Sequence, residues 1–380
     1  MKSLTAPYDE VALVLQGGGA LGSYQAGIIE AISEVGIEPT WVAGVSIGAI
    51  NAALVAGNPL DRRVEAIREF WDRVSHPGVF PSSPRIEGEL FNKLGDGIQQ
   101  FVSVVEGIRS LLEGRRGFFS PRLPEISSTP DRLSFYDTTP LKKTLLDLVD
   151  FELLNSGKVR LSVSAVNLAT GRETIFDSAH RTIRPEHIMA SGALPPGFPA
   201  VEVDGEYFWD GGLVSNTPLM QVLGGHPKSH TLVFQVDLWN GDGRLPQNLL
   251  EVPSRMKDIQ FASRSNRITD LVEQAHDQRV ILRRLLELIP EQTRQATDFC
   301  KEVEEMANDK RYNVLRLNYL DKPYDIQDKD FQFGSGAMLG HWACGISDMR
   351  RALSHPSWFK LPSEDNPFVQ RAVRTKVADA

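Results

Sequence analysis

The fold of this chain is decided by residues 11–22, VALVLQGGGALG, and by residues 41–57, WVAGVSIGAINAALVAG. Each stretch is an apolar run typical of a buried strand, followed by a glycine-rich turn and then by a helical pattern. Strands that alternate with helices in this way build a parallel sheet between helical layers. The sequence therefore predicts an α/β fold with three layers, α/β/α, on a mainly parallel central sheet.

The second turn, GVSIG at residues 44–48, places a serine where a nucleophile is expected. A nucleophile at a sharp strand-to-helix junction sits in strained backbone, so its neighbours must be small. Gly44 and Gly48 meet that need, and the positive end of the following helix points at Ser46. Taken alone, a Gly-x-Ser-x-Gly pattern is also compatible with an ordinary turn.

The first turn, Gly17 to Gly19, offers backbone amides that can hold an oxyanion. A dinucleotide-binding loop looks similar, but it expects an acidic residue about 20 residues further on. Residues 40–46, TWVAGVS, contain none, and no Gly-Lys-Ser or Gly-Lys-Thr follows to form a Walker loop. An ordinary α/β-hydrolase is disfavoured as well, because only one strand and one helix precede the serine strand. The two glycine-rich turns are therefore better interpreted as a site for acyl transfer than as a nucleotide-binding site.

A candidate base follows a predicted hairpin at residues 201–209, VEVDGEYFW, which turns at Asp204-Gly205. Its second strand delivers Asp210-Gly211-Gly212 into a loop. An aspartate after an aromatic strand, followed by two glycines, fits a catalytic carboxylate, although Asp-Gly is more often a plain turn. We expect Thr217 to cap the next helix and Pro218 to take its first position.

Taken together, these segments resemble the patatin-like phospholipase family over roughly residues 9–220. The motifs that carry the resemblance are GGGALG at 17–22, GVSIG at 44–48, ASGALPPGFP at 190–199, and DGG at 210–212 with Asn216 and Pro218. One departure is Leu21, where many members carry Arg or Lys. A phosphate or head-group contact from that side chain is therefore in doubt.

The resemblance implies a catalytic dyad in which Ser46 is the nucleophile and Asp210 is the general base. It also implies an oxyanion hole and a set of supporting glycines. The oxyanion amides are those of Gly17, Gly18 and Gly19, and the supporting motif glycines are Gly22, Gly44, Gly48, Gly211 and Gly212.

A dyad suffices if Asp210 accepts the serine proton directly, with its pKa raised by desolvation against Phe208 and Trp209. A Ser-Asp-His triad stays open as an alternative, because His226 and His230 follow in the right order. No metal or cofactor is expected. The two cysteines, at positions 300 and 344, have no ligand spacing.

The function that the resemblance implies is hydrolysis of fatty-acyl ester bonds of lipids through an acyl-enzyme, as in a phospholipase A or a lysophospholipase. An acyl lipid is then the expected substrate. Two alternatives remain. One is a thioesterase or an esterase for short-chain esters or polyester oligomers. The other is a catalytically idle protein that binds acyl lipids.

Composition favours a globular enzyme of 380 residues, and a net charge of -8 argues against nucleic acid as a partner. The first ten residues lack a leader pattern and cysteines are few, so we expect a cytoplasmic protein, with peripheral membrane contact left open. Residues 255–289 combine basic side chains with apolar residues at helical spacing. We interpret them as a solvated helix with a core face rather than a membrane-surface helix. The apolar positions are Ile268, Leu271, Ala275, Leu282, Leu285 and Ile289.

We expect a catalytic domain at 9–220, an extension at 221–355 that completes the sheet and adds helices, and a loose tail at 356–380. A helical, lid-like insertion is expected at about 78–135. Its helix at 97–112 is either a moving lid over an acyl groove or a helix packed permanently on the core. The other predicted elements are helices at 61–75 and 336–353, a hairpin of strands at 158–166 and 172–176, and strands at 231–238 and 312–317.

Overall fold

The structure is a computed structural model. It describes residues 4–75, 91, 93–123, 129–224, 229–243, 245–247, 249, 251–307, 309–322, 325 and 329–373. The predicted start of the lid-like insertion at about 78 and the candidate His226 lie outside the described residues.

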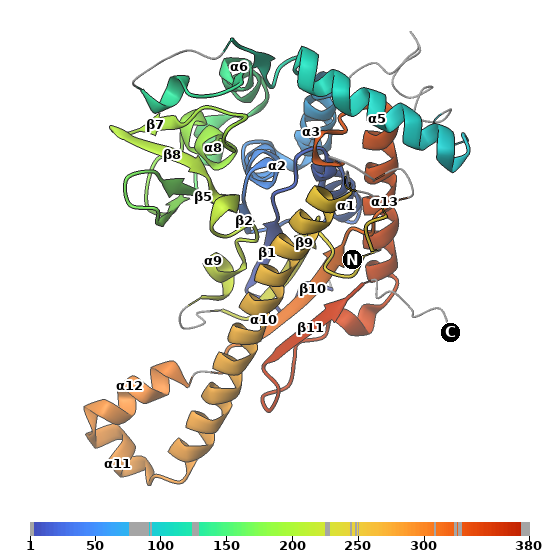
Figure 1. Ribbon diagram of the computed structural model, residues 1–380. Coiled ribbons are helices and arrows are strands. Elements are labelled where there is room, and N and C mark those ends of the chain that lie inside the picture. Colours follow the sequence, from blue (N-terminus) through green and yellow to red (C-terminus); the bar gives the residue numbers. More distant parts are fainter. Residues whose placement is uncertain are drawn as a thin grey trace.

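A nine-stranded sheet forms the centre of the described chain (Figure 1). From one edge to the other, its order is β11 (Phe368–Ala372), β10 (Tyr312–Asn318), β9 (Thr231–Asp237), β1 (Glu10–Leu15), β2 (Trp41–Gly44), β5 (Arg160–Asn167), β8 (Glu206–Asp210) and β7 (Val201–Val203), and β6 (Glu173–Asp177) also pairs with β5. The strands from β11 to β5 run parallel, whereas β6, β7 and β8 add antiparallel pairs. The predicted mainly parallel sheet is confirmed.

Helices cover both faces of this sheet, because successive strand residues point to opposite sides. In β1, Leu13 and Leu15 join one core, whereas Ala12 and Val14 join another. The first core is covered by α1 (Gly22–Glu34), α2 (Ile47–Ala56), α3 (Leu60–Val74) and α13 (Ser335–Leu353), and the second by α9 (Leu219–Leu223) and α10 (Val252–Glu287). The three-layer α/β/α fold is thereby confirmed.

The remaining elements lie around this frame. They are α5 (Asp96–Glu113), the short strands β3 (Ser120–Pro121) and β4 (Tyr136–Asp137), α6 (Thr139–Leu148), α7 (Phe151–Leu154), α8 (Pro185–Ser191), and the 3₁₀ helices η1 (Gly19–Leu21), η2 (Pro130–Arg132), η3 (Gly211–Leu213), η4 (Lys329–Phe331) and η5 (Pro356–Phe359). The far end of α10 runs beyond the sheet and, with α11 (Glu291–Ala296) and α12 (Asp298–Met306), forms a projecting arm (Figure 1).

The expectation of a loose tail is wrong for residues 356–373. These residues form η5 and β11, and β11 pairs in parallel with β10. Phe359 and Phe368 are buried. Burial of these two aromatic side chains orders the segment although most of it is polar. The exposed edge of β10 also provides unpaired backbone N–H and C=O groups with which β11 forms hydrogen bonds.

Helix α10 is present, but the predicted core face is wrong at several positions. Leu271 and Leu285 are 54% and 53% exposed. The buried line consists largely of small or polar residues, namely Ala262, Ser265, Thr269, Val272 and His276. Ser265 of this line contacts the polar side chains of Gln16 and Thr217, whereas Val272 joins the second core and the His276 ring stacks on Phe368.

The expected cap of α9 is also not formed. Pro218 is the N-cap residue and no side chain caps the helix. The Thr217 hydroxyl instead accepts a hydrogen bond from Gln16 Nε2, at 3.0 Å. The Thr217 hydroxyl therefore bonds a residue that is distant in sequence instead of a backbone N–H of the helix that follows it.

Candidate active site

Ser46 lies at the junction between β2 and α2, in the conformation that a nucleophile elbow requires. Its φ is 56°, a left-handed value that is rare for a residue with a side chain. A Cβ on Gly44 would stand 2.3 Å from the Gly48 carbonyl oxygen, and one on Gly48 would stand 2.3 Å from that of Leu15. Both glycines are therefore needed for the close approach of backbone around the turn.

The strained backbone of Ser46 is held by a neighbour from α8. The Ser46 N–H donates to both the carbonyl oxygen and the hydroxyl of Ser191, at 3.2 and 3.1 Å. Ser191 is fully buried. It lies within the ASGALPPGFP motif, but sequence reasoning gave it no role. Its position shows that this motif packs beneath the elbow.

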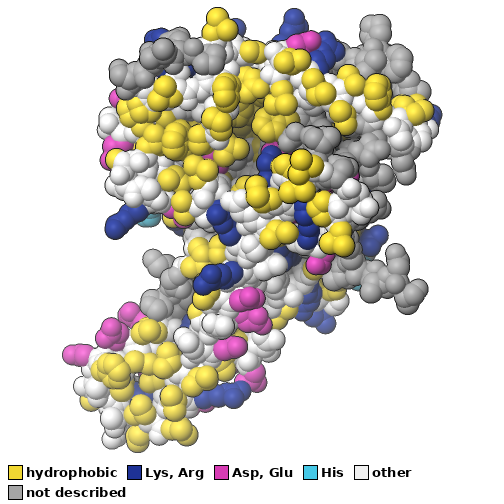
Figure 2. Space-filling view, viewed as in Figure 1, with side chains coloured by type: hydrophobic (Ala, Val, Ile, Leu, Met, Phe, Trp, Pro, Cys, Tyr) yellow, Lys and Arg dark blue, Asp and Glu magenta, His cyan; other side chains and the backbone are white. Residues whose placement is uncertain are grey.

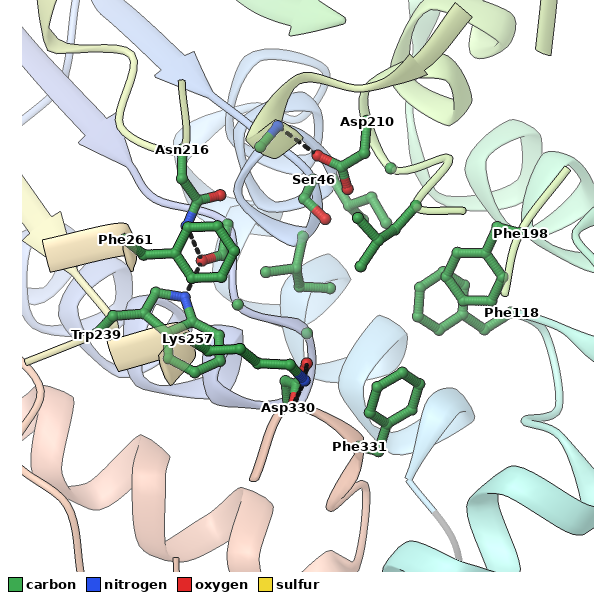
Figure 3. A pocket seen from close by; sticks show the side chains of 18 of the residues that line it. Ser46, Phe118, Phe198, Asp210, Asn216, Trp239, Lys257, Phe261, Asp330 and Phe331 are labelled. Carbon is green, nitrogen blue, oxygen red and sulfur yellow. Dashed lines mark hydrogen bonds and ion pairs between the residues drawn. The ribbon is translucent and has the colours of Figure 1, made fainter. Parts of the chain in front are cut away.

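Asp210 ends β8 and lies beside Ser46 (Figure 3), with only 2% of its surface exposed. Burial raises the pKa of this carboxyl to about 7, and hydrogen bonds with the Gly212 amide and the Ser46 hydroxyl oppose the rise. The Gly212 N–H donates to Oδ1 at 2.7 Å. A carboxylate with this pKa can take up a proton near neutral pH.

The glycine loop after β1 is fixed by contacts to one of its peptide groups. The Gly17 carbonyl accepts hydrogen bonds from Asn216 Nδ2 at 2.8 Å and from the Trp239 indole Nε1 at 2.7 Å (Figure 3). In a trans peptide the carbonyl and the following N–H point in opposite directions. The two donors therefore set the direction of the Gly18 N–H.

The three glycine amides are not equivalent. The Gly17 N–H donates to the Asn216 carbonyl at 3.2 Å, so it is not free to bind an oxyanion. Within the described chain, the amides of Gly18 and Gly19 donate no hydrogen bond to the protein. Both residues line the pocket that Ser46 also lines. The expected three-amide oxyanion hole is thus reduced to two candidates.

Gln16 connects this loop to the C-terminal part of the chain, a role that sequence reasoning missed. Its Oε1 accepts from the backbone N–H groups of Leu238 and Trp239, at 2.6 and 3.1 Å. Its Nε2 donates to Thr217 Oγ1 and to Ser265 Oγ of α10. The fully buried side chain ties β1, β9, α9 and α10 together behind the glycine loop.

A pocket opens at Ser46, and most of the side chains that line it are apolar, seven of them aromatic (Figure 3). They come from distant parts of the chain, and their apolar surface suits an alkyl chain. The aromatic residues are Phe118, Phe119, Phe198, Trp239, Phe261, Phe331 and Phe333. Only Phe198 belongs to a motif that the sequence analysis singled out.

A sequence profile described as Patatin-like phospholipase matches residues 13–223, and a second, described as Patatin phospholipase, matches residues 259–365. The first match spans more than half of the chain. The chain belongs to the patatin-like phospholipase family.

Individual relatives cover smaller parts of it. The cGAMP-activated phospholipase of Vibrio cholerae is 36% identical over 95 residues, which are 22% of this chain and 26% of that protein. Lysophospholipase NTE1 of Saccharomyces cerevisiae is 28% identical over 243 residues, 62% of this chain and 11% of that protein. This chain therefore matches about a quarter or less of the length of these relatives. Among solved structures, VipD from Legionella pneumophila is 15% identical with a TM-score of 0.35, and the match covers 89% of this chain and 67% of that one.

Leu21, where many patatin-like proteins carry a basic residue, is fully buried in the main core and does not line the pocket. A cation reaches the pocket from another element. Lys257 of α10 lines it and forms an ion pair with Asp330, with Nζ 2.7 Å from Oδ2. The polar end of a ligand in this patatin-like site would therefore meet a neutralised pair rather than a free charge.

The triad alternative through His230 is wrong. His230 immediately precedes β9 and its N–H donates to Asp9 Oδ2, at the amino end of the parallel strands. Ser46 follows the carboxyl end of β2. A strand of seven residues spans roughly 20 Å, so the imidazole cannot reach the dyad.

Among the described residues, no group of three or more His, Cys, Asp or Glu side chains is arranged to hold a metal ion. None of the helices in that part of the chain has both the length and the apolar character needed to cross a bilayer.

Proposed function

We propose that this patatin-like protein hydrolyses fatty-acyl ester bonds of lipids, in the manner of a phospholipase A or a lysophospholipase, through a Ser46/Asp210 dyad and an acyl-enzyme. The observation that carries this proposal is the position of Ser46. It stands on a strained elbow, beside a buried carboxyl with a pKa of about 7, at a pocket with seven aromatic residues in its lining.

In the first step, Asp210 accepts the hydroxyl proton as Ser46 Oγ attacks the ester carbonyl. The negative charge that develops on the carbonyl oxygen is held by the amides of Gly18 and Gly19. Donors of this kind are typically worth about 3–4 kcal/mol each when one is removed. Collapse of the tetrahedral intermediate passes the proton to the leaving alcohol or lysolipid.

In the second step, Asp210 removes a proton from water, which attacks the acyl carbon; the bond from that carbon to Ser46 Oγ then breaks, Asp210 returns the proton to Oγ, and the fatty acid is released. The acyl chain remains in the aromatic pocket during both steps. Several phenylalanines there pack edge to face, including Phe118 on Phe119 with ring centroids 5.3 Å apart. A rigid apolar wall of this kind excludes water and favours long acyl chains.

The deciding experiment measures fatty-acid release from phospholipid, lysophospholipid, acyl-CoA and short p-nitrophenyl esters. Wild type is compared with Ser46→Ala and Asp210→Asn. We expect release from phospholipid or lysophospholipid, and a loss of at least about 10³-fold in kcat in either variant. Substantial activity remaining in either variant would overturn the dyad.

The same panel separates the alternatives. Turnover of only thioesters or short esters would identify a thioesterase or a short-chain esterase. An idle acyl-lipid-binding protein would release no acid and would resist stoichiometric labelling of Ser46 by a fluorophosphonate. Labelling that requires Ser46 and Asp210, without release from any ester, would indicate a competent dyad with an untested substrate class.

A further inference from the structure

Helix α5 is arranged the opposite way from an ordinary surface helix. Its outward stripe is apolar, and its members are 38–72% exposed. The stripe consists of Ile98, Phe101, Val105, Ile108 and Leu112, which recur at spacings of three and four and so share one face. A surface helix normally turns such a stripe toward the core.

The inward stripe of α5 is polar and buried, comprising Gln99, Ser103, Glu106 and Ser110. Gln99 Nε2 donates to the Phe91 carbonyl at 2.8 Å, and Ser110 Oγ donates to the Glu106 carbonyl at 2.7 Å. From outside the helix, the Tyr136 hydroxyl donates to the Leu111 carbonyl. These contacts fix which face of α5 points outward, so its apolar stripe is not available to the core.

Helix α5 lies next to the pocket, because it packs against η4, whose Asp330 and Phe331 line the pocket. The chain leaves α5 at Gly114 and supplies Phe118 and Phe119 to the pocket wall a few residues later. On another side, Lys257 and Phe261 of α10 also line the pocket.

The start of α10 carries a second exposed stripe, consisting of Val252, Met256 and Ile259, which are 44%, 61% and 51% exposed. We call the α5 stripe and this α10 stripe together the apolar rim. In Figure 2, hydrophobic side chains gather around the hollow in this face and along α5.

We propose that the apolar rim is a docking surface for a lipid bilayer, into which these side chains insert so that the pocket opens directly onto the membrane. This inference rests on the proposed acyl hydrolase function, because it supplies the route by which an acyl chain reaches Ser46. The rim would remain in contact with the acyl region of the bilayer while a single lipid is withdrawn into the pocket.

A lipid surface fits the rim better than a second protein copy does. A protein partner seated on both stripes would cover the mouth of the pocket, whereas a bilayer is both the contact and the source of substrate. Charge does not decide the choice. Residues 252–267 contain four basic residues and one acidic residue, but Lys257 is paired with Asp330, and α5 contains three acidic residues and one basic residue. The contact with the bilayer is therefore expected to be mainly apolar.

The test measures co-sedimentation with phosphatidylcholine vesicles, with and without phosphatidylglycerol. All proteins carry Ser46→Ala so that no lipid is consumed. Phe101→Ser combined with Ile108→Ser removes two exposed apolar side chains without adding charge. We expect vesicle affinity to fall by about tenfold or more. With Ser46 intact, the same pair should leave kcat/KM for a short p-nitrophenyl ester unchanged, which also reports correct folding.

A matched control lies on the projecting arm. Ile281 and Leu288 are separated by seven residues, as Phe101 and Ile108 are, and are 58% and 80% exposed. Changing both to serine should leave vesicle affinity unchanged. If the α5 pair impairs the soluble ester reaction, the single variant Met256→Ser tests the α10 side of the rim instead.

Three results would overturn the docking proposal. They are a parent protein that does not bind vesicles, an α5 variant that binds as tightly as the parent, and an arm variant that loses as much affinity. If the α5 substitutions convert a dimer to a monomer and leave vesicle binding unaltered, the α5 stripe is an interface with a second copy of the chain. If wild type hydrolyses no ester, the proposed function fails while the vesicle measurement still decides docking.

Discussion

At the scale of single residues, the glycine loop after β1, proposed to bind the oxyanion, depends on an indole that lies 222 residues away in the sequence. Trp239 Nε1 and Asn216 Nδ2 both bond the Gly17 carbonyl and thereby orient the Gly18 amide. We predict that Trp239→Phe lowers kcat by about tenfold with little change in KM, because phenylalanine keeps most of the apolar contact but cannot donate. The rate of fluorophosphonate labelling should fall in parallel.

Trp41→Phe is the matched control for this prediction. The Trp41 indole is also buried, and it donates to Ser162 Oγ at 2.8 Å, away from the pocket lining. Its loss should reduce stability without a selective effect on kcat. An equal fall in kcat for both variants, or a change confined to KM for Trp239→Phe, would contradict a positioning role for Trp239.

The buried carboxyl of Asp210 predicts how activity depends on pH. Its pKa is raised to about 7 by burial, and only the ionised form can act as a base. We therefore expect kcat/KM for a soluble ester to rise with pH through about 7 and to fall about tenfold per unit below it. A profile already flat at pH 5 would show that Asp210 ionises normally or is not the base.

The same pKa shift affects stability. Since the folded-state pKa of Asp210 lies well above the ordinary value for an aspartate, its contribution to stability is fully present at low pH and is lost as pH rises through about 7. Asp210→Asn should thus be more stable than wild type at pH 8, by about 2–4 kcal/mol, and no more stable near pH 4. Urea unfolding at the two pH values measures this, and equal stabilities at pH 8 would refute the assigned burial cost.

For single residues, the sequence revealed those candidate site residues that lie within a short, recognisable motif. Ser46 and Asp210 each sit in a short glycine-flanked motif, so a few adjacent residues reveal them. Trp239 and Gln16 have no such signal, because their roles arise from hydrogen bonds across more than 200 residues. The Gly17 amide was misassigned for a related reason, since its acceptor, the Asn216 carbonyl, is distant in sequence.

At the scale of elements, the elbow between β2 and α2 depends on close backbone contact with β1. A Cβ on Gly48 would lie 2.3 Å from the Leu15 carbonyl oxygen, and backbone cannot move aside as a flexible side chain can. We predict that Gly48→Ala destabilises the protein by about 2 kcal/mol or more and displaces Ser46, with loss of ester hydrolysis. Thermal unfolding and the short-ester assay measure the two effects.

Gly97→Ala provides the comparison within a helix. Gly97 is exposed in the first turn of α5, and a Cβ there meets no atom within 4 Å. Alanine should be neutral or stabilising by up to about 1 kcal/mol, since it has the higher helix propensity. If Gly48→Ala proved equally harmless, the close contact would not be what requires glycine at the elbow.

The existence of elements was easier to predict than the side on which they are buried. The helix expected at 97–112 is α5, Asp96–Glu113, yet its apolar stripe faces outward. Periodicity identifies a two-sided helix, and the assumption that the apolar side faces the core fails where an external apolar surface has another use. The same assumption misplaced the core face of α10.

At the scale of the whole molecule, the catalytic segment and the C-terminal extension share one sheet. The first family match ends at residue 223, and the second begins at residue 259; β9 lies between them and pairs with β1 in the middle of the sheet. The sequence predicted that the extension completes the sheet. It could not reveal that the extension also holds the oxyanion loop through Trp239, because which strands become neighbours depends on the folded topology.

The contribution of the last strand, β11, to the stability of this shared sheet can be measured by truncation. Deleting residues 366–380 removes β11, uncovers the edge of β10, and exposes the partners of Phe368 and Val373, which are 5% and 6% exposed. Burial of two such side chains contributes about 3–5 kcal/mol, a large part of the 5–15 kcal/mol of a typical domain. We therefore predict a marked fall in the urea midpoint. A truncation after Val373 retains β11 and its pairing with β10, and should keep the midpoint of the full chain. Equal midpoints for both truncations would mean that β11 adds nothing to the sheet, and would restore the expectation of a loose tail from residue 356.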